Sequence, residues 1–332
     1  MAEKFNDTEY LYLTSVVRAR QANMLSSEIF EQMLSAGSFK LATNILTDYG
    51  WADMSDMDSS AINSYLSNYQ NSIFREIEEY VPQIEVLDLF RIKYDYHNAK
   101  CIIKSEGYGT KLDPIYSEVG RVTFEELEKA YRNEDYRFIP LPFAKSIIEA
   151  RSVLAKTSNP QFADFVLDKS LYKELLTVAN YLDNEFLIQY VMLQIDGANL
   201  RTLVRCSRMK KDVSFVQNAL IPGGSVTPEC LLRAFPSGEA LGLFATSKYK
   251  EAVSLGNDAL NGGRLTEFEL ECDNTINRFV RDAKLRGFGP EAIVGYLSAV
   301  EGNVTSLRMI LTGLLADISP ETIRERLRLS YV

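Results

Sequence analysis

Side chains suited to acid–base or nucleophilic catalysis are few in this chain of 332 residues. His97 is its only histidine, so any serine–histidine–aspartate or cysteine–histidine arrangement would depend on this one imidazole. The pattern around it is helical, and a surface histidine or one with a satisfied hydrogen bond explains it better than a general base does. The sequence therefore predicts no catalytic site at His97.

The most metal-like stretch is DMSDMD, which carries Asp53, Asp56 and Asp58. It lacks the glycine at the sixth position and the closing glutamate of an EF-hand loop, and no second acidic cluster completes a magnesium site. Acidic residues also favour the first turn of a helix, where they complement its dipole. We therefore expect an exposed helix start and no metal site.

Neither a GxxxxGK[ST] loop nor a GxGxxG loop occurs, so the sequence does not support phosphate binding by a glycine-rich loop, or any cofactor. The glycine-rich stretch 286–293 is expected to be a turn that enters a helix at Pro290. The four cysteines are dispersed and form no CxxC pair, which favours free thiols over a disulfide framework or a zinc site. They are Cys101, Cys206, Cys230 and Cys272.

One combination of polar residues occurs three times, at intervals of about a hundred residues. Each copy has Asp or Asn first, Asn or Ser three positions later, Lys or Arg five positions later, and then two aliphatic residues. The copies are Asp95, Asn98 and Lys100; Asp196, Asn199 and Arg201; and Asn303, Ser306 and Arg308.

On a helix, these spacings put the first residue of each copy inside the apolar stripe, the amide or hydroxyl beside it and the base at its far edge. A polar group in a buried stripe needs a hydrogen-bond partner. One interpretation is that the polar groups tie each helix to its neighbours within its own helical unit. The alternative is that the three bases lie on a surface that meets a partner.

The elements that position these residues are predicted to be helices. Apolar residues recur at helical spacing, a Thr–x–x–Glu capping box joins Thr123 to Glu126, and Ser319 precedes Pro320 at a helix start. The stretch 9–37 is also predicted to be helical and to end at Gly37. Alternating strand patterns are scarce, so the predicted fold is all-α.

The repeated motif and the loops suggest three helical domains, 1–112, 113–218 and 219–332. Loops at 107–114 and 219–229 separate them, and a period of about a hundred residues is too long for the usual solenoid repeats. A tyrosine also follows an apolar segment in each third, at Tyr49, Tyr172 and Tyr249. We expect three similar helical domains.

Composition limits the partners. The net charge is −9 and the pI is near 5.0, which disfavours nucleic acid as a partner and direct adhesion to an anionic membrane through a polybasic patch. No run of 18 apolar residues occurs and the N-terminus lacks the pattern of a signal peptide. These features predict a cytoplasmic protein.

The densest basic stretch is 200–211, with Arg201, Arg205, Arg208, Lys210 and Lys211. Such a run is typical of a solvated helix C-terminus, where cations complement the dipole. In an acidic protein it is also a candidate docking patch for an acidic protein partner.

Three features together resemble one family. They are YLTSVVRARQANMLSSEIFEQML near the start, the three motif helices, and YLSAVEGNVTSLRMILTGLLADISPETIRERL near the end. They are similar to the C subunit of the bacterial and archaeal A/V-type ATPases, whose eukaryotic counterpart is called the d subunit. The resemblance covers nearly the whole chain, and 301–313 is its most specific part. The third copy departs from the first two by having Asn303 and Ser306.

The resemblance implies a funnel of three similar helical domains around a pseudo-threefold axis. It implies a non-catalytic subunit that links the central stalk to the membrane proteolipid ring and so supports ATP-linked proton or sodium transport. Such a subunit lies on the cytoplasmic face of the membrane and associates with it through protein partners only. Arg201, Arg205, Arg208 and Lys210 are then candidate stalk contacts. The alternative is a free-standing all-α scaffold that binds helical partners.

Overall fold

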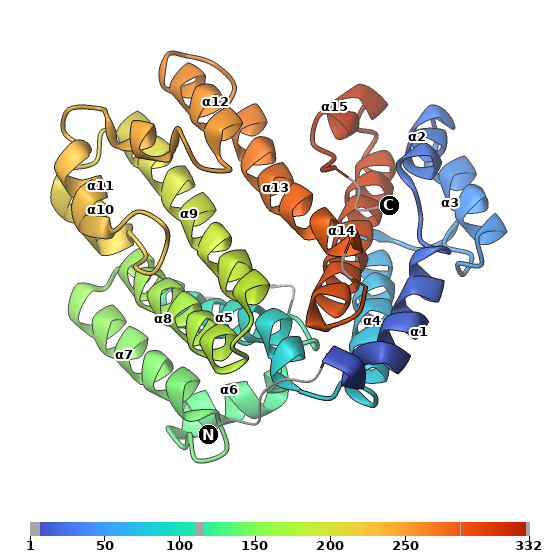
Figure 1. Cartoon of the computed structure of the whole chain (residues 1–332), viewed down its shortest axis with the longest axis horizontal. Coiled ribbons are helices and arrows are strands. Elements are labelled where there is room, and N and C mark those ends of the chain that lie inside the picture. The colour runs from blue at the N-terminus through green and yellow to red at the C-terminus, as the bar shows by residue number, and fades with distance from the viewer. Residues whose placement is uncertain (1–6, 110–115, 286, 330–332) are drawn as a thin grey trace. The chain divides into compact units, whose positions relative to one another are not determined.

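The computed structural model describes residues 7–109, 116–285 and 287–329 (Figure 1). Within these ranges the elements are helices and no strand occurs, so the all-α prediction is confirmed. The chain forms two compact units, one of Met1–Pro82 with Asp273–Val332 and one of Gln83–Cys272. The predicted boundary at 112 lies outside the described residues, and the division into three domains stays a prediction.

The first unit combines the two ends of the chain around one long helix, α14. This helix packs against α1, α2, α3, α4 and α15. The elements of this unit are η1 (Asp7–Tyr10), α1 (Leu11–Gln21), α2 (Ser27–Ser35), α3 (Phe39–Asp48), α4 (Ser59–Glu78), the end of α13 (Leu265–Arg281), η3 (Asp282–Leu285), α14 (Pro290–Leu315) and α15 (Pro320–Arg324).

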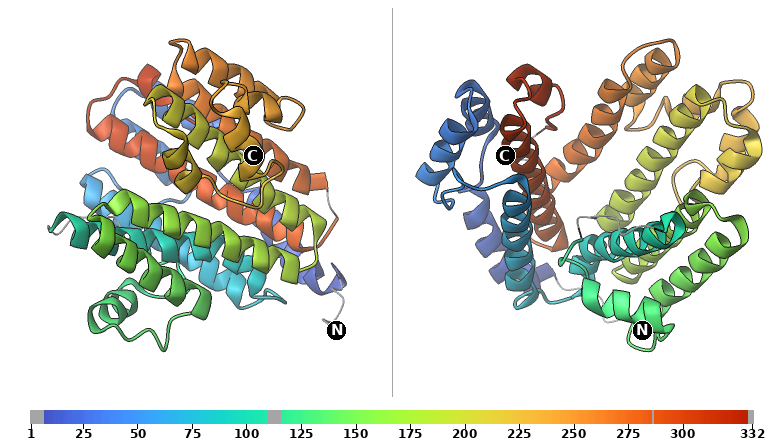
Figure 2. Two further views of the ribbon diagram at one scale, coloured as in Figure 1. Left: turned by 90° about the vertical axis from the view of Figure 1, so that its left-hand side faces the viewer. Right: turned by 180° about the vertical axis from the view of Figure 1, so that it is seen from behind.

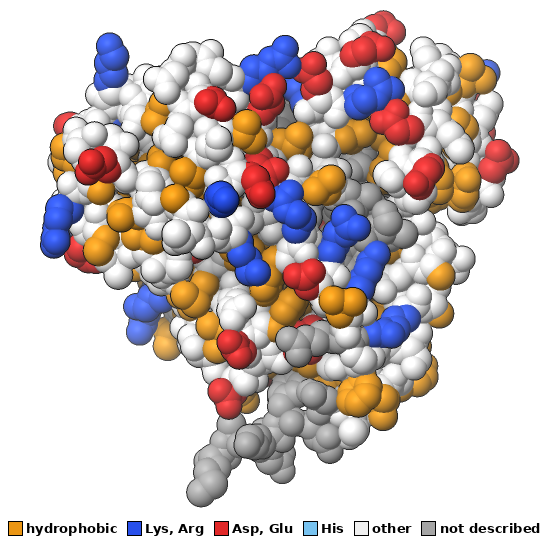
Figure 3. Space-filling view, turned by 45° about the horizontal axis from the view of Figure 1, so that its top comes forward, with side chains coloured by type: hydrophobic (Ala, Val, Ile, Leu, Met, Phe, Trp, Pro, Cys, Tyr) orange, Lys and Arg blue, Asp and Glu red, His pale blue; other side chains and the backbone are white. Residues whose placement is uncertain are grey.

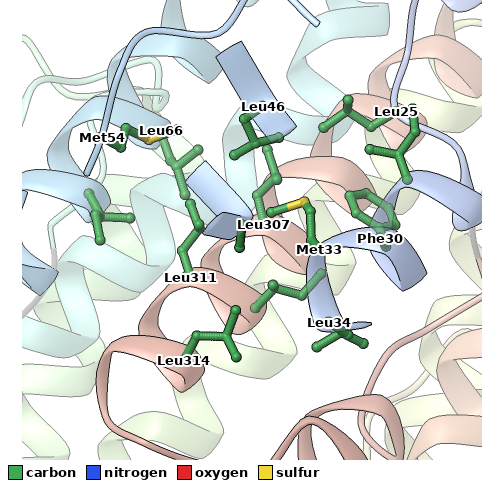
Figure 4. Close-up of a cluster of buried hydrophobic side chains, with 14 of the residues drawn as sticks. Leu25, Phe30, Met33, Leu34, Leu46, Met54, Leu66, Leu307, Leu311 and Leu314 are labelled. Atoms are coloured by element: carbon green, nitrogen blue, oxygen red, sulfur yellow. The ribbon is translucent and has the colours of Figure 1, made fainter. Parts of the chain in front are cut away.

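The core of this unit is drawn in Figure 4, where Leu307 and Leu311 of α14 lie among side chains of α2, α3 and α4. Phe30 and Met33 come from α2 and Leu66 from α4. Because α14 is apolar on most of its circumference, it must be covered on most sides. The N-terminal helices and the last long helix therefore share one core.

The second unit is built on long helices that lie side by side. The closest packing joins α8 to α7 and to α5, and α9 packs against α8 and α12 (Figure 2). Its elements are α5 (Glu85–Tyr108), α6 (Phe124–Asn133), α7 (Leu141–Thr157), α8 (Pro160–Tyr181), α9 (Glu185–Arg208), α10 (Val213–Ala219), α11 (Pro228–Ala234), η2 (Ala240–Phe244), α12 (Lys250–Leu260) and the start of α13.

Most of the predicted helix ends are confirmed. The capping box of Thr123 and Glu126 opens α6, Ser319 caps α15, and Asp58 caps α4 by accepting a hydrogen bond from the N–H of Ala61. Helix α14 begins at Pro290, as predicted. Of the predicted loop 107–114, residues 110–114 lie outside the described residues, as does position 286 of the predicted turn.

The prediction of helix over 9–37 is wrong in its middle. The stretch forms two helices, α1 and α2, because Ser26 adopts an extended backbone and becomes the N-cap of α2. Leu25, in the intervening turn, is buried in the core that α14 shares with α2. Gly37 follows α2 with a positive φ of 71°, which agrees with the predicted end at that residue.

On the face drawn in Figure 3, acidic and basic side chains are interspersed with exposed hydrophobic ones. Among the described residues, no helix has the length and apolar character that spanning a membrane would require.

Candidate functional site

The first copy of the motif binds the loop that precedes α6. Asp95 of α5 is fully buried. Its Oδ1 accepts hydrogen bonds from the backbone N–H groups of Arg121 (2.8 Å) and Val122 (3.2 Å). A Cβ atom at Gly120 would overlap this carboxylate, so the loop passes over Asp95 at a distance that only glycine allows.

Asn98, one turn later on α5, holds the same loop by a pair of backbone hydrogen bonds. Its Nδ2 donates to the carbonyl of Ser117 (2.8 Å), and its Oδ1 accepts from the N–H of Ser117 (3.0 Å). The side-chain amide of Asn98 thus pairs with both backbone groups of Ser117. These hydrogen bonds compensate for the burial of the amide. Together, Asp95 and Asn98 fix the loop to α5.

The carboxylate of Asp95 also belongs to a buried ionic network. The Nε of Arg121 donates to Asp95 (2.7 Å), and its Nη1 donates to Glu174 of α8 (2.7 Å). The hydroxyl of Tyr96 donates to the other oxygen of Glu174 (2.9 Å). Burial raises the pKa of Asp95, while Arg121 and the backbone donors act in the opposite direction. This network joins α5, the loop and α8.

The second copy repeats the arrangement on α9 without the ionic part. Asp196 accepts hydrogen bonds from the N–H (2.8 Å) and the hydroxyl (2.6 Å) of Ser225, and a Cβ at Gly224 would overlap its carboxylate. Asn199 pairs with the backbone of Ile221 in both directions, at 2.8 and 2.9 Å. Burial raises the pKa of Asp196, while the hydrogen bonds from Ser225 lower it.

The two loops share a sequence pattern of their own, which the spacing of the motif does not reveal. Residues 120–125 read GRVTFE and residues 224–229 read GSVTPE, with the glycine under the motif acid in each. Thr123 and Thr227 are the N-caps of α6 and α11. The pattern glycine, any residue, valine, threonine, any residue, glutamate could have identified the loops as partners of the motif. We call each helix with its loop a clamp.

The third copy lies on α14, in the first unit. Asn303 and Ser306 are buried, and α14 packs against α1 and α2, which flank the turn containing Leu25. This turn has no glycine, and Leu25 belongs to the same core cluster as Leu307. The third copy, which has Asn and Ser where the others have Asp and Asn, thus lies on a helix that packs against the N-terminal helices.

The clamps therefore connect consecutive thirds of the sequence. Both motif helices and the loops that they hold lie within one compact unit, Gln83–Cys272, and whether each motif acts within its own predicted domain stays a prediction. Asp95 and Asn98 hold residues 117–122, beyond the predicted boundary at 112. Asp196 and Asn199 likewise hold 221–225, beyond the predicted boundary at 218.

Lys100 and Arg308 each contact a long helix. Lys100 forms an ion pair with Asp168 of α8 (2.5 Å). Arg308 donates to Asn63 (2.9 Å) and Ser67 (3.4 Å) of α4. Arg201 is half-buried on α9. Lys100 and Arg308 thus tie their motif helices to a neighbouring helix of the same unit.

The basic run lies where α9 ends. Arg205 is exposed and pairs with Glu269 of α13 (2.6 Å), and Lys211 lies over the ring of Phe215. Arg208 is the last residue of α9 and is exposed. Lys210 follows with a positive φ of 51°. Arg205, Arg208 and Lys210 thus lie at an exposed helix end, whereas Arg201 is half-buried earlier on α9. The role of these stalk-contact candidates stays a prediction.

The remaining candidates for chemistry are separated in the structure. His97 is exposed on α5, with its Nε2 3.7 Å from the Sγ of Cys101. Burial raises the pKa of that thiol, which disfavours the nucleophilic thiolate.

Tyr49 follows α3 and is half exposed, Tyr172 lies within α8, and Tyr249 is fully buried before α12. The three tyrosines are therefore not equivalent. The described residues hold no group of three His, Cys, Asp or Glu arranged for a metal.

Comparison with known proteins identifies the family to which the chain belongs. The family model of the ATP synthase (C/AC39) subunit matches residues 13–326. The chain belongs to this family. It is 25% identical to the C subunit of the V-type sodium ATPase of Enterococcus hirae, over 97% of the chain and 99% of the relative. It is 22% and 24% identical to the C subunits of the A-type ATP synthases of Methanocaldococcus jannaschii and Pyrococcus abyssi, over 96% of the chain and 86% and 90% of those relatives. The resemblance is confirmed, and the chain is a relative of the C subunits of A-type and V-type ATPases.

Proposed function

We propose that the chain is the non-catalytic coupling subunit of a rotary A/V-type ATPase, linking the central stalk to the proteolipid ring. The observation that carries this proposal is the full-length similarity to the C subunits, which covers 97% of the chain and 99% of the Enterococcus relative. In this role the chain transmits rotation between ATP hydrolysis or synthesis and the transport of protons or sodium ions. It contributes no catalytic group and holds no cofactor of its own.

The clamps support the mechanical part of this role. An element that transmits torque must not yield at the joints between its parts. Asp95 and Asn98 at one joint, and Asp196 and Asn199 at the next, bind backbone groups of the following third. Buried polar side chains that have hydrogen-bond partners, as these four have, restrict motion and favour one arrangement. We propose that these joints stiffen three helical domains arranged around a pseudo-threefold axis.

The stalk would bind through exposed charged residues, with the run at the end of α9 as the leading candidate. Complementary charge sets the register of two proteins and speeds their association. Arg205 already pairs with Glu269, and Arg201 is half-buried. Arg208 and Lys210 are therefore the better candidates among the four. Association with the cytoplasmic face of the membrane would follow from binding the ring.

A bridging experiment tests the proposal. Proteolipid rings in vesicles are mixed with the central-stalk subunits, with and without this chain, and the vesicles are recovered. We expect the stalk to sediment with ring-containing vesicles only when the chain is present, and not with vesicles that lack the ring. Equal recovery of the stalk with and without the chain would contradict a bridging role and favour a free-standing scaffold.

A further inference from the structure

The third copy of the motif differs from the two clamps in its hydrogen bonding. Asn303 and Ser306 of α14 are 6% and 8% exposed, yet their side chains make no hydrogen bond within the part of the chain that the structure describes. In the clamps, side chains at the same positions bind backbone groups of a loop at 2.8–3.2 Å. A buried polar group without a partner costs free energy, so α14 carries a cost where α5 and α9 gain hydrogen bonds.

A segment with the pattern of the clamp loops lies between α1 and α2. Residues 23–28 read NMLSSE, where the clamp loops read GRVTFE and GSVTPE. Ser26 is the N-cap of α2, in the place of the threonines that cap α6 and α11. Leu25, in the place of the valine, is 1% exposed and belongs to the core cluster that α14 shares with α2. The pattern thus identifies this turn as the counterpart of the clamp loops, and α14 packs against both helices that flank it.

The turn has a side chain at the position where the clamp loops have none. A Cβ atom at Gly120 or Gly224 would overlap the motif acid, so the close approach of these loops requires glycine. Asn23 occupies the same place in the turn. The N–H of Met24, the next residue, donates to the carbonyl of Gln21 (3.2 Å), whereas the N–H at this place in the clamps donates to the motif acid. The turn is therefore hydrogen-bonded to the end of α1 where a clamp loop would bind its motif helix.

Two further hydroxyl groups without partners lie on α1 and α14, which pack against each other. The Oγ1 of Thr14 on α1 and the Oγ of Ser298 on α14 are buried and have no hydrogen-bond partner among the described residues. On an ideal helix, Ser298, Ser306 and Asn303 lie within an arc of about 140°. One side of α14 thus carries several polar groups that would gain hydrogen bonds from water if the turn moved away.

We propose that the third copy forms an open clamp, in which the turn at residues 23–26 separates from α14 in solution while the loops 117–122 and 221–225 stay bound to α5 and α9. Separation lets water reach Asn303 and Ser306, which offsets part of the apolar packing that is lost. Both clamps lie in the second unit and the open clamp lies in the first, so it opens without loosening them. Local opening is a property of the chain alone, so this inference and the proposed function can fail separately.

Hydrogen exchange of the full chain, resolved to single amides, tests the open clamp. Leu25 and Val122 hold the same place in the pattern and are both buried, but the N–H of Val122 donates to a motif side chain. After correction for intrinsic rates, we expect the amide of Leu25 to exchange at least about tenfold faster than that of Val122. Equal or greater protection at Leu25 would overturn the proposal.

A matched pair of substitutions gives an independent test. Asn303→Leu replaces an amide that has no hydrogen-bond partner, whereas Asn199→Leu replaces one that binds both backbone groups of Ile221. We expect Asn303→Leu to leave the urea midpoint unchanged or to raise it, and Asn199→Leu to lower it. A similar decrease in both variants would mean that Asn303 holds a partner as Asn199 does, which contradicts an open clamp.

The converse experiment closes the clamp. The triple variant Asn23→Gly, Asn303→Asp, Ser306→Asn gives the turn and the helix the residues of the second clamp. We expect the amide of Leu25 to become at least about tenfold more protected, while protection of the amide of Ser225 stays unchanged. Circular dichroism checks that the variant is folded. A folded variant in which Leu25 gains no protection would show that the turn is not the counterpart of the clamp loops.

Discussion

At the residue scale, the two clamps in the second unit differ in what neutralises the motif acid. Asp95 faces the guanidinium of Arg121, which also binds Glu174. Asp196 accepts hydrogen bonds from the N–H and hydroxyl groups of its loop. Removing one partner of a buried ion pair costs more than weakening hydrogen bonds from uncharged donors, because it leaves a charge poorly compensated.

This difference predicts unequal effects of the same substitution. Asp95→Asn should lower the free energy of unfolding by about 3 kcal/mol, and Asp196→Asn by about 1 kcal/mol. Denaturant unfolding of both variants gives the comparison. Equal losses, or a larger loss for Asp196→Asn, would show that the ionic network does not strengthen the first clamp.

The glycines under the acids give a second prediction. Gly120→Ala and Gly224→Ala should each destabilise the fold by at least about 1 kcal/mol, because the added methyl group overlaps a buried carboxylate. At Gly302, in α14, an added methyl group would have nothing within 4 Å. Gly302→Ala should therefore stabilise the chain by up to about 1 kcal/mol through helix propensity. Similar stability changes at all three glycines would contradict the close approach in the clamps.

The pH dependence of stability should report Asp88, at the start of α5. Its pKa is raised to about 6, mainly by burial and also by Asp95 and Glu85, against the effects of Arg121 and Arg91. Because this lies above the ordinary value of 3.8, the folded chain retains a proton that the unfolded chain releases. The stability contributed by that proton is fully present below pH 3.8 and is lost as pH rises through 6.

The variant Asp88→Asn isolates this effect. Relative to the unchanged chain, it should gain stability as the pH rises from about 4 to about 7, by up to about 3 kcal/mol. Urea unfolding of both proteins across this range measures the difference. A difference that does not change with pH would mean that Asp88 is not the group responsible.

The sequence could predict the burial of the motif residues but not their partners. Helical spacing puts Asp95, Asp196 and Asn303 in an apolar stripe, and all three are buried. Their spacing describes one helix only, whereas the partners of Asp95 and Asp196 lie in loops 26 and 29 residues further along the chain. The glycine and the valine that the two loops share become informative only when the loops are compared.

At the element scale, helices with strong end signals are the ones that the sequence predicts well. Thr123 with Glu126, and Ser319 with Pro320, begin helices where expected. The turn between α1 and α2 escapes prediction, because its residues continue an apolar pattern that is compatible with helix. Leu25 packs into the core in spite of lying in a turn, so tertiary packing decides its conformation.

The role of α14 in the first unit gives a prediction for this scale. Leu307 is fully buried among side chains of α2, α3 and α4, so Leu307→Ala should cost about 2–5 kcal/mol. Hydrogen exchange should show reduced protection in α2, α3 and α4 together with α14. The matched control Leu315→Ala changes a leucine of α14 that is 37% exposed and should cost much less. Loss of protection confined to α14 would mean that the two ends of the chain do not share one cooperative core.

At the scale of the whole molecule, the clamps and α14 share one pattern of contacts between parts of the sequence. A motif helix near the end of one third of the sequence holds the start of the next, as in α5 and α9, and α14 packs with the first helices of the chain. The sequence could show that the motif repeats. It could not show that a motif helix holds the start of the next third, because that contact depends on how the helices pack. The proposed three-domain funnel would extend this rule to the complete chain.

The stalk-contact candidates at the end of α9 give the next prediction. Arg208→Glu with Lys210→Glu should leave the fold intact, since exposed sites change stability by about 0.5 kcal/mol or less, and should weaken binding of the isolated central stalk. What binding remains should be less sensitive to salt. Lys145→Glu with Lys156→Glu, on α7, is the control. Unchanged stalk affinity in the first variant would leave this run as a solvated helix end.

The coupling of ATP hydrolysis to ion transport is the most direct test of the central claim. Proteoliposomes containing the complete ATPase are compared with proteoliposomes assembled without this chain, and ATP-driven ion uptake is measured beside ATP hydrolysis. We expect that without the chain the catalytic head still hydrolyses ATP while ion uptake is lost, and that adding the purified chain restores uptake. Ion uptake that stays undiminished without the chain would contradict its role in coupling.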